Sequence, residues 1–368
     1  MSMAYTKKQK TKYLILNYMM NCGATSKVEL AKLLNLSMPT VLSNVNELME
    51  QGLVTEQGEM ESTGGRKAVL IGLQKNYRYA LGVDITTNHQ GMVLVNLGGE
   101  IVKQQRIREK FDTGLSYYSR LSERLREFYK GEAEEARILG VGISLPGIIN
   151  QRERLLVRSH ALQLENYSLK VMEQLLAMPV YFENDANAAM LAENLQKWKN
   201  AIYLSLNHTL GGAVCIDGTL FTGQNRKAGE FGHMIQVPDG KPCYCGKRGC
   251  VDAYCAASVL TQGGTIRLED FMEGIPKDPG KARLWEEYLD HLALLISNIR
   301  MSFDADIILG GDVGGYLPEY MLKLGQKLFQ YNLFDGDLSY LKNCSYRKEA
   351  SAVGVAKHFL RSLIEEVS

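Results

Sequence analysis

Hydrophobic residues recur with a helical period through the first fifty residues of the chain, and capping signals divide this stretch into three short helices. The segment 7–20 begins basic and continues with apolar residues spaced for one helical face. Thr25 or Ser26 is then placed to cap a second helix, and Glu29 completes a capping box with Ser26. We expect this second helix to end near Asn35.

The third helix is expected to run from a cap at Ser37 to Gly52. Its predicted inner face consists of Val41, Leu42, Val45, Leu48 and Met49. Two short helices joined by a few residues form a helix-turn-helix, in which the second helix presents its N-terminal residues to the major groove of DNA. The candidates for contact with bases or phosphates are the residues on its expected exposed early turns, namely Met38, Pro39, Thr40, Ser43 and Asn44.

A β-hairpin wing and a basic arm are expected next. Two β-like runs flank Gly58 within residues 53–73, and a loop over residues 62–67 joins two glycines to Arg66 and Lys67. An arginine in such an arm can enter the minor groove, where contacts favour A·T-rich sequence. We therefore add Arg66 and Lys67 to the expected DNA-binding residues.

Net charge does not decide what this first domain binds. Residues 1–70 contain eight Lys or Arg and six Asp or Glu, so their net charge is 8 − 6 = +2, which is weakly basic. A small helical module that binds another protein stays open as an alternative for residues 1–72. The helix spacing, the wing and the basic arm favour a winged helix-turn-helix that binds DNA, and two modest half-sites would then favour a dimer.

Beyond this domain, strands begin to alternate with helices. A β run at 79–85 precedes residues 91–108, where two strands flank a Gly-Gly turn. A helix is expected over about 117–130, and a buried strand over 138–145. A strand at 179–184 and an apolar hairpin at 201–218 follow. This order is similar to the two-lobed, actin-like or RNase-H-like α/β fold of sugar kinases, which closes on a sugar and a nucleotide.

A cluster of cysteines and turn-forming residues lies between residues 226 and 258. His233, Cys243, Cys245 and Cys250 fall within eighteen residues, and four such side chains can close a tetrahedral zinc site. The loop has little hydrophobic material, so zinc would supply the free energy that orders it. A disulfide with a spare thiol is the alternative. Seven cysteines and no recognisable signal peptide instead suit a reducing compartment, which we take to be the cytoplasm.

Acidic side chains flank this cluster. Glu230 precedes His233 and Asp252 follows Cys250, and carboxylates beside an imidazole suit the vicinal hydroxyls of a sugar. The segments AGEFGH and CYCGKRGCVDAY, which hold these residues, resemble the signature of the ROK family of bacterial sugar-responsive repressors and sugar kinases. The resemblance implies that His233 and the three cysteines bind structural zinc, and that Glu230, His233 and Asp252 bind the sugar. The family usually has Glu where this chain has Asp252.

The resemblance extends to a sugar-binding pair and to weakened phosphate loops. Asn184 and Asp185 match the family motif E-N-D-A-N, in which the Asp is catalytic in the kinases, whereas an ordinary turn or helix cap is the alternative. Residues 84–88 read D-I-T-T-N where the kinases have D-x-G-G-T, so side chains fill space that a phosphate needs. A second glycine-rich turn is reduced to N-H-T-L-G-G over 207–212. Gly310-Gly311 is intact, but a strand-to-helix turn explains it equally well.

These features predict a winged helix-turn-helix over residues 1–72, a first lobe over 73–184 to which the helix 350–368 returns, and a second lobe over 185–349. The expected function is that of a repressor that binds operator DNA as a homodimer or homotetramer and responds to a monosaccharide or amino sugar. ATP with Mg²⁺ is not expected as a cofactor, and no run of eighteen apolar residues indicates a membrane span. An ATP-dependent ROK sugar kinase with Asp185 as base, and a scaffold that binds a protein partner, are the alternatives.

Overall fold

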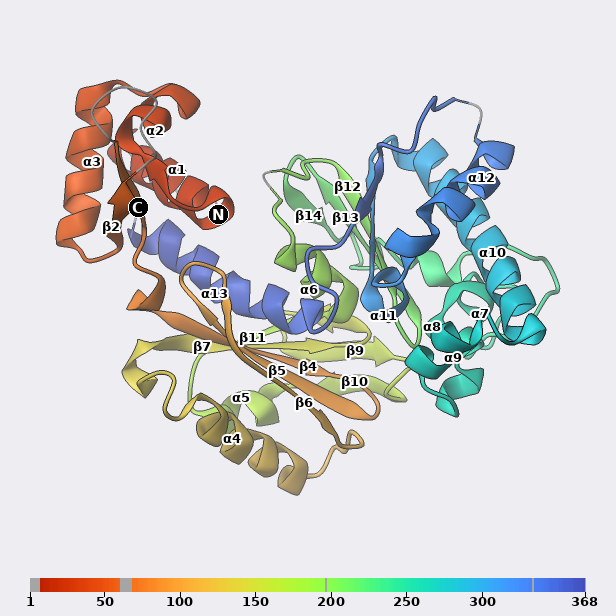
Figure 1. Ribbon diagram of the computed structural model, residues 1–368. Coiled ribbons are helices and arrows are strands. Elements are labelled where there is room, and N and C mark those ends of the chain that lie inside the picture. The colour runs from red at the N-terminus through yellow and green to blue at the C-terminus, as the bar shows by residue number, and fades with distance from the viewer. Residues whose placement is uncertain (1–6, 60–67, 196, 333, 368) are drawn as a thin grey trace.

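The computed structural model describes residues 7–59, 68–195, 197–332 and 334–367. A small N-terminal domain lies over one end of a first α/β lobe, and a second α/β lobe lies beside the first (Figure 1). Among the described residues, no helix combines the length and the apolar character that a membrane crossing requires.

The N-terminal domain packs helices against a short antiparallel sheet in which β3 lies between β1 and β2. Its elements are α1 (Lys7–Cys22), β1 (Thr25–Ser26), α2 (Lys27–Leu33), α3 (Met38–Glu50), β2 (Val54–Glu59) and β3 (Val69–Leu73). The predicted capping box at Ser26 and Glu29 is confirmed, and Ser37 caps α3 as predicted. Gly58 lies inside β2 with a φ of 105°, so the prediction of two runs about this glycine is wrong.

The basic arm that carries Arg66 and Lys67 lies outside the described residues.

The inward face of α3 differs from the predicted one at two positions. Leu42, predicted inside, is 38% exposed, whereas Asn44, predicted to face DNA, is only 5% exposed. The Asn44 amide donates to the Thr40 carbonyl oxygen at 2.8 Å, within the helix. The prediction of an exposed Asn44 is therefore wrong, because the helix buries a stripe with i, i+3, i+4, i+7 spacing that includes this residue. That stripe is Val41, Asn44, Val45 and Leu48.

Each lobe is built on a five-stranded mixed sheet, and the two sheets repeat one pattern. Three consecutive strands form an antiparallel meander, and two later strands join it in parallel at the first strand. The first sheet contains, in spatial order, β11 (Val180–Asn184), β7 (Ile138–Leu145), β4 (Tyr79–Ile85), β5 (His89–Asn96) and β6 (Ile101–Arg108). The second contains β14 (Thr219–Phe221), β13 (Leu210–Ile216), β12 (Ala201–Leu206), β15 (Asp306–Gly310) and β16 (Leu341–Asn343).

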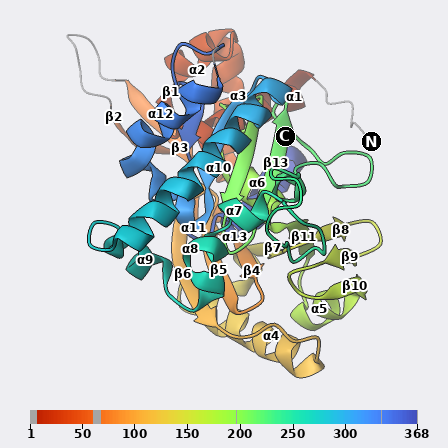
Figure 2. The ribbon, with the colours of Figure 1, turned by 90° about the vertical axis from the view of Figure 1, so that its right-hand side faces the viewer.

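A small antiparallel sheet, which the sequence pattern did not predict, extends the first lobe next to α5 (Figure 2). Its strands are β8 (Ile148–Asn150), β9 (Leu155–Ser159) and β10 (Leu164–Ser168). The helices of the lobes are α4 (Leu115–Tyr129), α5 (Lys170–Leu176), α6 (Asp185–Ala192), α7 (Asp252–Cys255), α8 (Ala257–Leu260), α9 (Leu268–Gly274), α10 (Pro279–Phe303), α11 (Gly311–Gly314), α12 (Met321–Tyr331) and α13 (Ala350–Val367). Short 3₁₀ turns occur at Lys75–Tyr77, Glu135–Arg137, Phe231–His233, Gln262–Gly264 and Leu317–Tyr320.

The C-terminal helix α13 connects all three parts of the molecule. It crosses the first sheet and packs against α6, and it lies below the N-terminal domain (Figure 1). Its contacts are close enough to require glycine, because a Cβ built at Gly354 would lie 1.6 Å from the Ala188 carbonyl oxygen. Residues of α13 such as Leu360 and Ile364 share one hydrophobic cluster with Ile15 of α1. The N-terminal domain is therefore packed on the helix that contacts α6.

Candidate functional site

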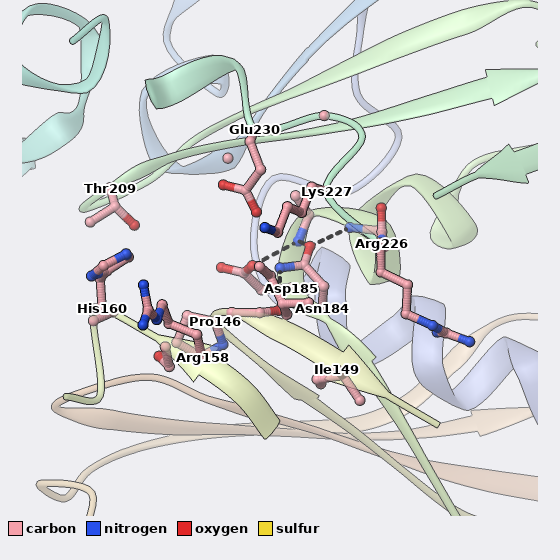
Figure 3. A pocket seen from close by; sticks show the side chains of 18 of the residues that line it. Pro146, Ile149, Arg158, His160, Asn184, Asp185, Thr209, Arg226, Lys227 and Glu230 are labelled. Atoms are coloured by element: carbon pink, nitrogen blue, oxygen red, sulfur yellow. Dashed lines mark hydrogen bonds between the residues drawn. The ribbon is translucent and has the colours of Figure 1, made fainter. Parts of the chain in front are cut away.

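A cleft of about 570 Å³ lies between the two lobes. The first lobe contributes the Pro146-Gly147 turn after β7, residues at the end of β9, and the junction of β11 with α6. The second lobe contributes the turn at 209–212 and the loop from Thr222 to Glu230. In Figure 3, Lys227 and Glu230 point from the second lobe toward Asp185 of the first. The cleft is thus a polar site to which both lobes contribute.

Asn184 and Asp185 lie at the start of α6, but they have different roles. The Asn184 Oδ1 accepts hydrogen bonds from the backbone N–H groups of Ala186 and Asn187, both at 3.0 Å, and its Nδ2 donates to the Gly147 carbonyl oxygen at 3.0 Å. Asn184 is therefore the cap of α6. It also lines the cleft, so its contact with a sugar stays a prediction. This cap explains why α6 begins at Asp185.

Asp185 faces the cleft directly from the first turn of α6. Burial, together with the nearby Asp84 carboxylate, raises the pKa of Asp185 to about 7. Burial also raises the pKa of Glu230, and the Lys227 ammonium partly offsets that shift. Two carboxyl groups with raised pKa values therefore face the cleft from opposite lobes, and in its protonated form such a group can donate as well as accept a hydrogen bond.

Asp252 does not line the cleft, contrary to the expectation that it contacts a sugar. Its side chain is 5% exposed, and Oδ1 accepts a hydrogen bond from the Leu210 backbone N–H at 2.6 Å. Burial raises the pKa of Asp252 to about 6. The shorter Asp side chain ends at the backbone of β13, so it fixes the turn beside the cleft and does not reach into it.

His233, Cys243, Cys245 and Cys250 converge as predicted. Their ligand atoms all lie within 4.8 Å of one another. The Cys245 and Cys250 sulfurs are 3.8 Å apart, as are the Cys243 sulfur and the His233 Nδ1. Zn–S bonds of about 2.3 Å in a tetrahedron place sulfurs about 3.8 Å apart, so the donor set and its spacing fit zinc. All seven cysteines, each within the described residues, are free thiols, which does not support the disulfide alternative.

Hydrogen bonds of two threonines hold the β4–β5 turn, which the resemblance matches to the D-x-G-G-T turn of the kinases. The Thr86 N–H donates to the His89 carbonyl oxygen at 2.9 Å, and the Thr87 hydroxyl donates to the Ala161 carbonyl oxygen at 3.2 Å. Arg106 and Glu349 form an ion pair at 3.4 Å nearby, and burial raises the pKa of Glu349 to about 7.

The intact pair Gly310-Gly311 is the turn from β15 into α11, where Gly311 has a φ of 78°.

Sequence reasoning missed several side chains that line the cleft. Arg158 and His160 lie at the end of β9, Lys227 lies beside Glu230, and Tyr244 lies between two of the cysteines. The position of Tyr244 between two expected metal ligands was a usable signal, because ligands on both sides fix where its ring lies. The residues at the end of β9 carried no such signal, since the small sheet itself was not predicted.

Comparison with known proteins places these features in a family. The sequence model of the ROK family matches residues 80–361. A sequence model of winged helix-turn-helix DNA-binding domains matches residues 8–55. The chain is 31% identical over 260 residues to the xylose repressor of Caldicellulosiruptor bescii (strain ATCC BAA-1888 / DSM 6725 / KCTC 15123 / Z-1320). That match covers 69% of this chain and 65% of the repressor, just under two thirds of its length.

Two further comparisons extend over more of the chain. The xylose repressor of Bacillus spizizenii (strain ATCC 23059 / NRRL B-14472 / W23) is 26% identical over 316 residues, covering 83% of this chain and 82% of that protein. A crystal structure of a ROK family transcriptional regulator, a homologue of the Escherichia coli MLC protein, superposes with a TM-score of 0.74 at 21% identity and covers 98% of each chain. The predicted fold, a winged helix-turn-helix followed by a two-lobed ROK domain, is confirmed.

Proposed function

The chain belongs to the ROK family, and on that premise we propose that it is a sugar-responsive transcriptional repressor. The observation that carries the proposal is the packing of a winged helix-turn-helix on α13, which contacts α6 at the edge of a polar interlobe cleft. The proposed effector is a monosaccharide or amino sugar, bound between Asp185 on one side and Glu230 and His233 on the other. The repressors named above support this function.

DNA contact is assigned to the exposed early turns of α3. Met38, Pro39 and Ser43 are exposed there, and Leu42 joins them in place of the buried Asn44. Thr40 is half-buried, and its hydroxyl is 2.7 Å from the Ser37 hydroxyl, so it supports the start of the helix. Arg66 and Lys67 remain the proposed minor-groove arm. Because one such module offers few base contacts, we propose a homodimer that binds two operator half-sites.

Structural zinc is proposed on His233, Cys243, Cys245 and Cys250. The segment between His233 and Cys250 contains isolated bridges but no helix or longer strand, so its own packing stabilises it little. The metal would order this loop and fix the His233 ring beside the cleft.

A path for coupling runs from the cleft to DNA through α6 and α13. Asp185 opens α6, and the other end of α6 is held by α13: Arg361 donates to the Leu191 carbonyl oxygen at 2.8 Å, and Lys357 donates to the Ala192 carbonyl oxygen at 2.5 Å. The Asn194 amide, just beyond α6, donates to a carbonyl oxygen of α1 at 3.4 Å. Sugar binding that moves α6 would therefore move the N-terminal domain, provided the sugar binds two lobe arrangements with different affinity.

The alternative function is an ATP-dependent sugar kinase. The pKa of Asp185, raised to about 7, favours it, because a carboxylate poised near neutrality suits a general base. The side chains of Thr86 and Thr87 oppose it, since they occupy the turn that would hold phosphate.

Calorimetry against pentoses, hexoses and N-acetylhexosamines, with and without Mg-ATP, separates the two functions. We expect saturable sugar binding that ATP does not change, and loss of that binding in Glu230→Gln but not in Glu127→Gln, an exposed glutamate on α4. Sustained heat in the presence of sugar and ATP would establish the kinase instead.

A further inference from the structure

Three aromatic rings that line the cleft lie next to one another and come from both lobes. His160 follows β9 in the first lobe, whereas His233 and Tyr244 belong to the zinc-binding segment of the second. The His160 ring centroid is 6.0 Å from that of His233 and 6.2 Å from that of Tyr244, and the two are 5.3 Å apart. All three pairs are edge-to-face, and all three residues line the cleft.

The second-lobe half of this group is tied to the metal ligands. The His233 Nδ1 faces Cys243, and its Nε2 lies 3.3 Å from the Tyr244 hydroxyl. A histidine that binds zinc through one nitrogen is oriented by the partner of its other nitrogen. Tyr244 lines the cleft and is 45% exposed, so part of its side chain is accessible to a ligand.

The first-lobe half is held by Thr87, one of the residues that replaces a phosphate-loop glycine. Its hydroxyl donates to the Ala161 carbonyl oxygen at 3.2 Å, which ties the β4–β5 turn to the segment that carries His160. Thr86 makes a different contact: its hydroxyl bonds within the same turn, to His89, at 3.1 and 3.2 Å. Adjacent threonines of the altered loop thus have separable roles.

Resting on the repressor function proposed above, we infer that His160 and Tyr244 form an aromatic clasp that grips the ring of a bound pyranose, with Thr87 as its positioning residue. Ring C–H groups of a pyranose pack on aromatic faces, while its hydroxyls bond to His233 Nε2 and to the carboxyl groups below. Because His160 belongs to one lobe and Tyr244 to the other, the clasp makes sugar affinity depend on how the two lobes are arranged. In this chain the former phosphate turn supports effector binding.

Sugar affinity of matched variants provides the first arm of the test, using the sugar that binds most tightly in the calorimetric panel. His160→Ala should weaken binding about tenfold, and Thr87→Val about threefold, as expected for one lost hydrogen bond. Thr86→Val and Tyr331→Phe should leave the affinity within error, and operator affinity without sugar should stay unchanged in all four. Tyr331 is 46% exposed and Tyr244 is 45% exposed, so Tyr331→Phe also serves as the control for Tyr244→Phe in the second arm. Unchanged affinity in His160→Ala, or equal losses in Thr86→Val and Thr87→Val, would overturn the clasp.

Imidazole NMR spectra of the sugar-free, zinc-loaded protein form the second arm, and six histidines are few enough to resolve. The His233 signals should move in His160→Ala and in Tyr244→Phe, the His160 signals should move in Thr87→Val, and neither should move in Tyr331→Phe. If these shifts occur but the wild-type protein binds no sugar, the proposed sugar response is wrong, and the contact between His160 and His233 is nevertheless confirmed. If His233 is unaffected by His160→Ala, the contact itself is disproved.

Discussion

Asp185 carries a proton-sensitive charge at the centre of the cleft. Its carboxyl group lies at the N-terminus of α6, where burial and Asp84 raise its pKa to about 7. Near neutrality the group exists in both protonation states, so it can donate to or accept from a sugar hydroxyl. The residue alone does not separate a sensor from a kinase, because both need it. We propose that Thr86 and Thr87 separate them, because they stand where the kinases have the two glycines of the phosphate turn.

The raised pKa of Asp185 predicts a pH-dependent gain in stability for Asp185→Asn. The folded state keeps its proton up to about pH 7, whereas the unfolded state loses it near the ordinary value of 3.8, so ionisation destabilises the fold increasingly as the pH rises between these values. The substituted side chain of the Asp185→Asn variant cannot ionise, so the variant does not lose this stability as the pH rises. Its free energy of unfolding should match the wild type near pH 4 and exceed it by about 1–2 kcal/mol at pH 8, a figure reduced from the full shift because the carboxyl faces water in the cleft.

Urea unfolding at a series of pH values measures this difference, with Asp239→Asn as the control on an exposed aspartate. A constant difference between pH 4 and pH 8 would show that Asp185 ionises normally.

The residues that the sequence predicted correctly are those whose roles depend on short-range spacing. The Cys/His ligands converge because tight turns within one segment bring them together, and the capping box at Ser26 is local by definition. Asn44 and Asp252 were misplaced for another reason: their type and position suited a ligand, but the register of α3 and the reach of a shorter side chain buried them. His160 depends on a sheet formed by short, weakly patterned strands, which periodicity alone does not reveal.

At the scale of elements, we propose that the segment between the Phe231–His233 turn and α7 is stabilised by a metal more than by its own packing. We predict that Cys245→Ser loses zinc and loses the sugar response with it, because three ligands leave the loop and the His233 ring unfixed. Metal analysis and sugar calorimetry on the same preparation check both losses. Cys344→Ser is the matched control, since Cys344 is also a half-buried free thiol but lies outside the cluster. A Cys245→Ser protein that responds normally to sugar would separate the metal from the effector site.

The crossing of α6 and α13 is a second element-scale feature that admits a direct test. Gly354→Ala places a Cβ against the Ala188 carbonyl oxygen, a backbone atom that cannot rotate away. We expect a loss of about 1–3 kcal/mol in stability from overpacking, and a sugar response on DNA that is weakened more than sugar affinity itself. Gly336→Ala, where no atom lies within 4 Å of the new Cβ, should be neutral in both assays. If sugar changes the DNA affinity of Gly354→Ala as much as that of the wild type, α6 and α13 do not transmit the signal from the cleft to the N-terminal domain.

For the whole molecule, the two-lobed architecture was predictable because its strands are long and continuous in apolar character, and because the end of β11 carries a recognisable motif. The placement of the N-terminal domain was not predictable, since it depends on residues of α1 and α13 that are distant in sequence and individually ordinary. Packed together in one hydrophobic cluster, they make the domain part of a continuous body with α13. We propose that a change in the cleft reaches the N-terminal domain through this shared packing.

The central claim is that sugar in the cleft changes DNA binding, and fluorescence anisotropy tests it most directly. Labelled DNA sites selected by the full-length protein from a random pool are titrated with the protein, with and without the sugar panel and in the absence of ATP. We predict tight, salt-dependent binding, and at least one monosaccharide or amino sugar that lowers DNA affinity about tenfold, within the usual range of allosteric coupling. No such shift should occur in Glu230→Gln. DNA affinity that no sugar alters, or no selected DNA site at all, would contradict the account.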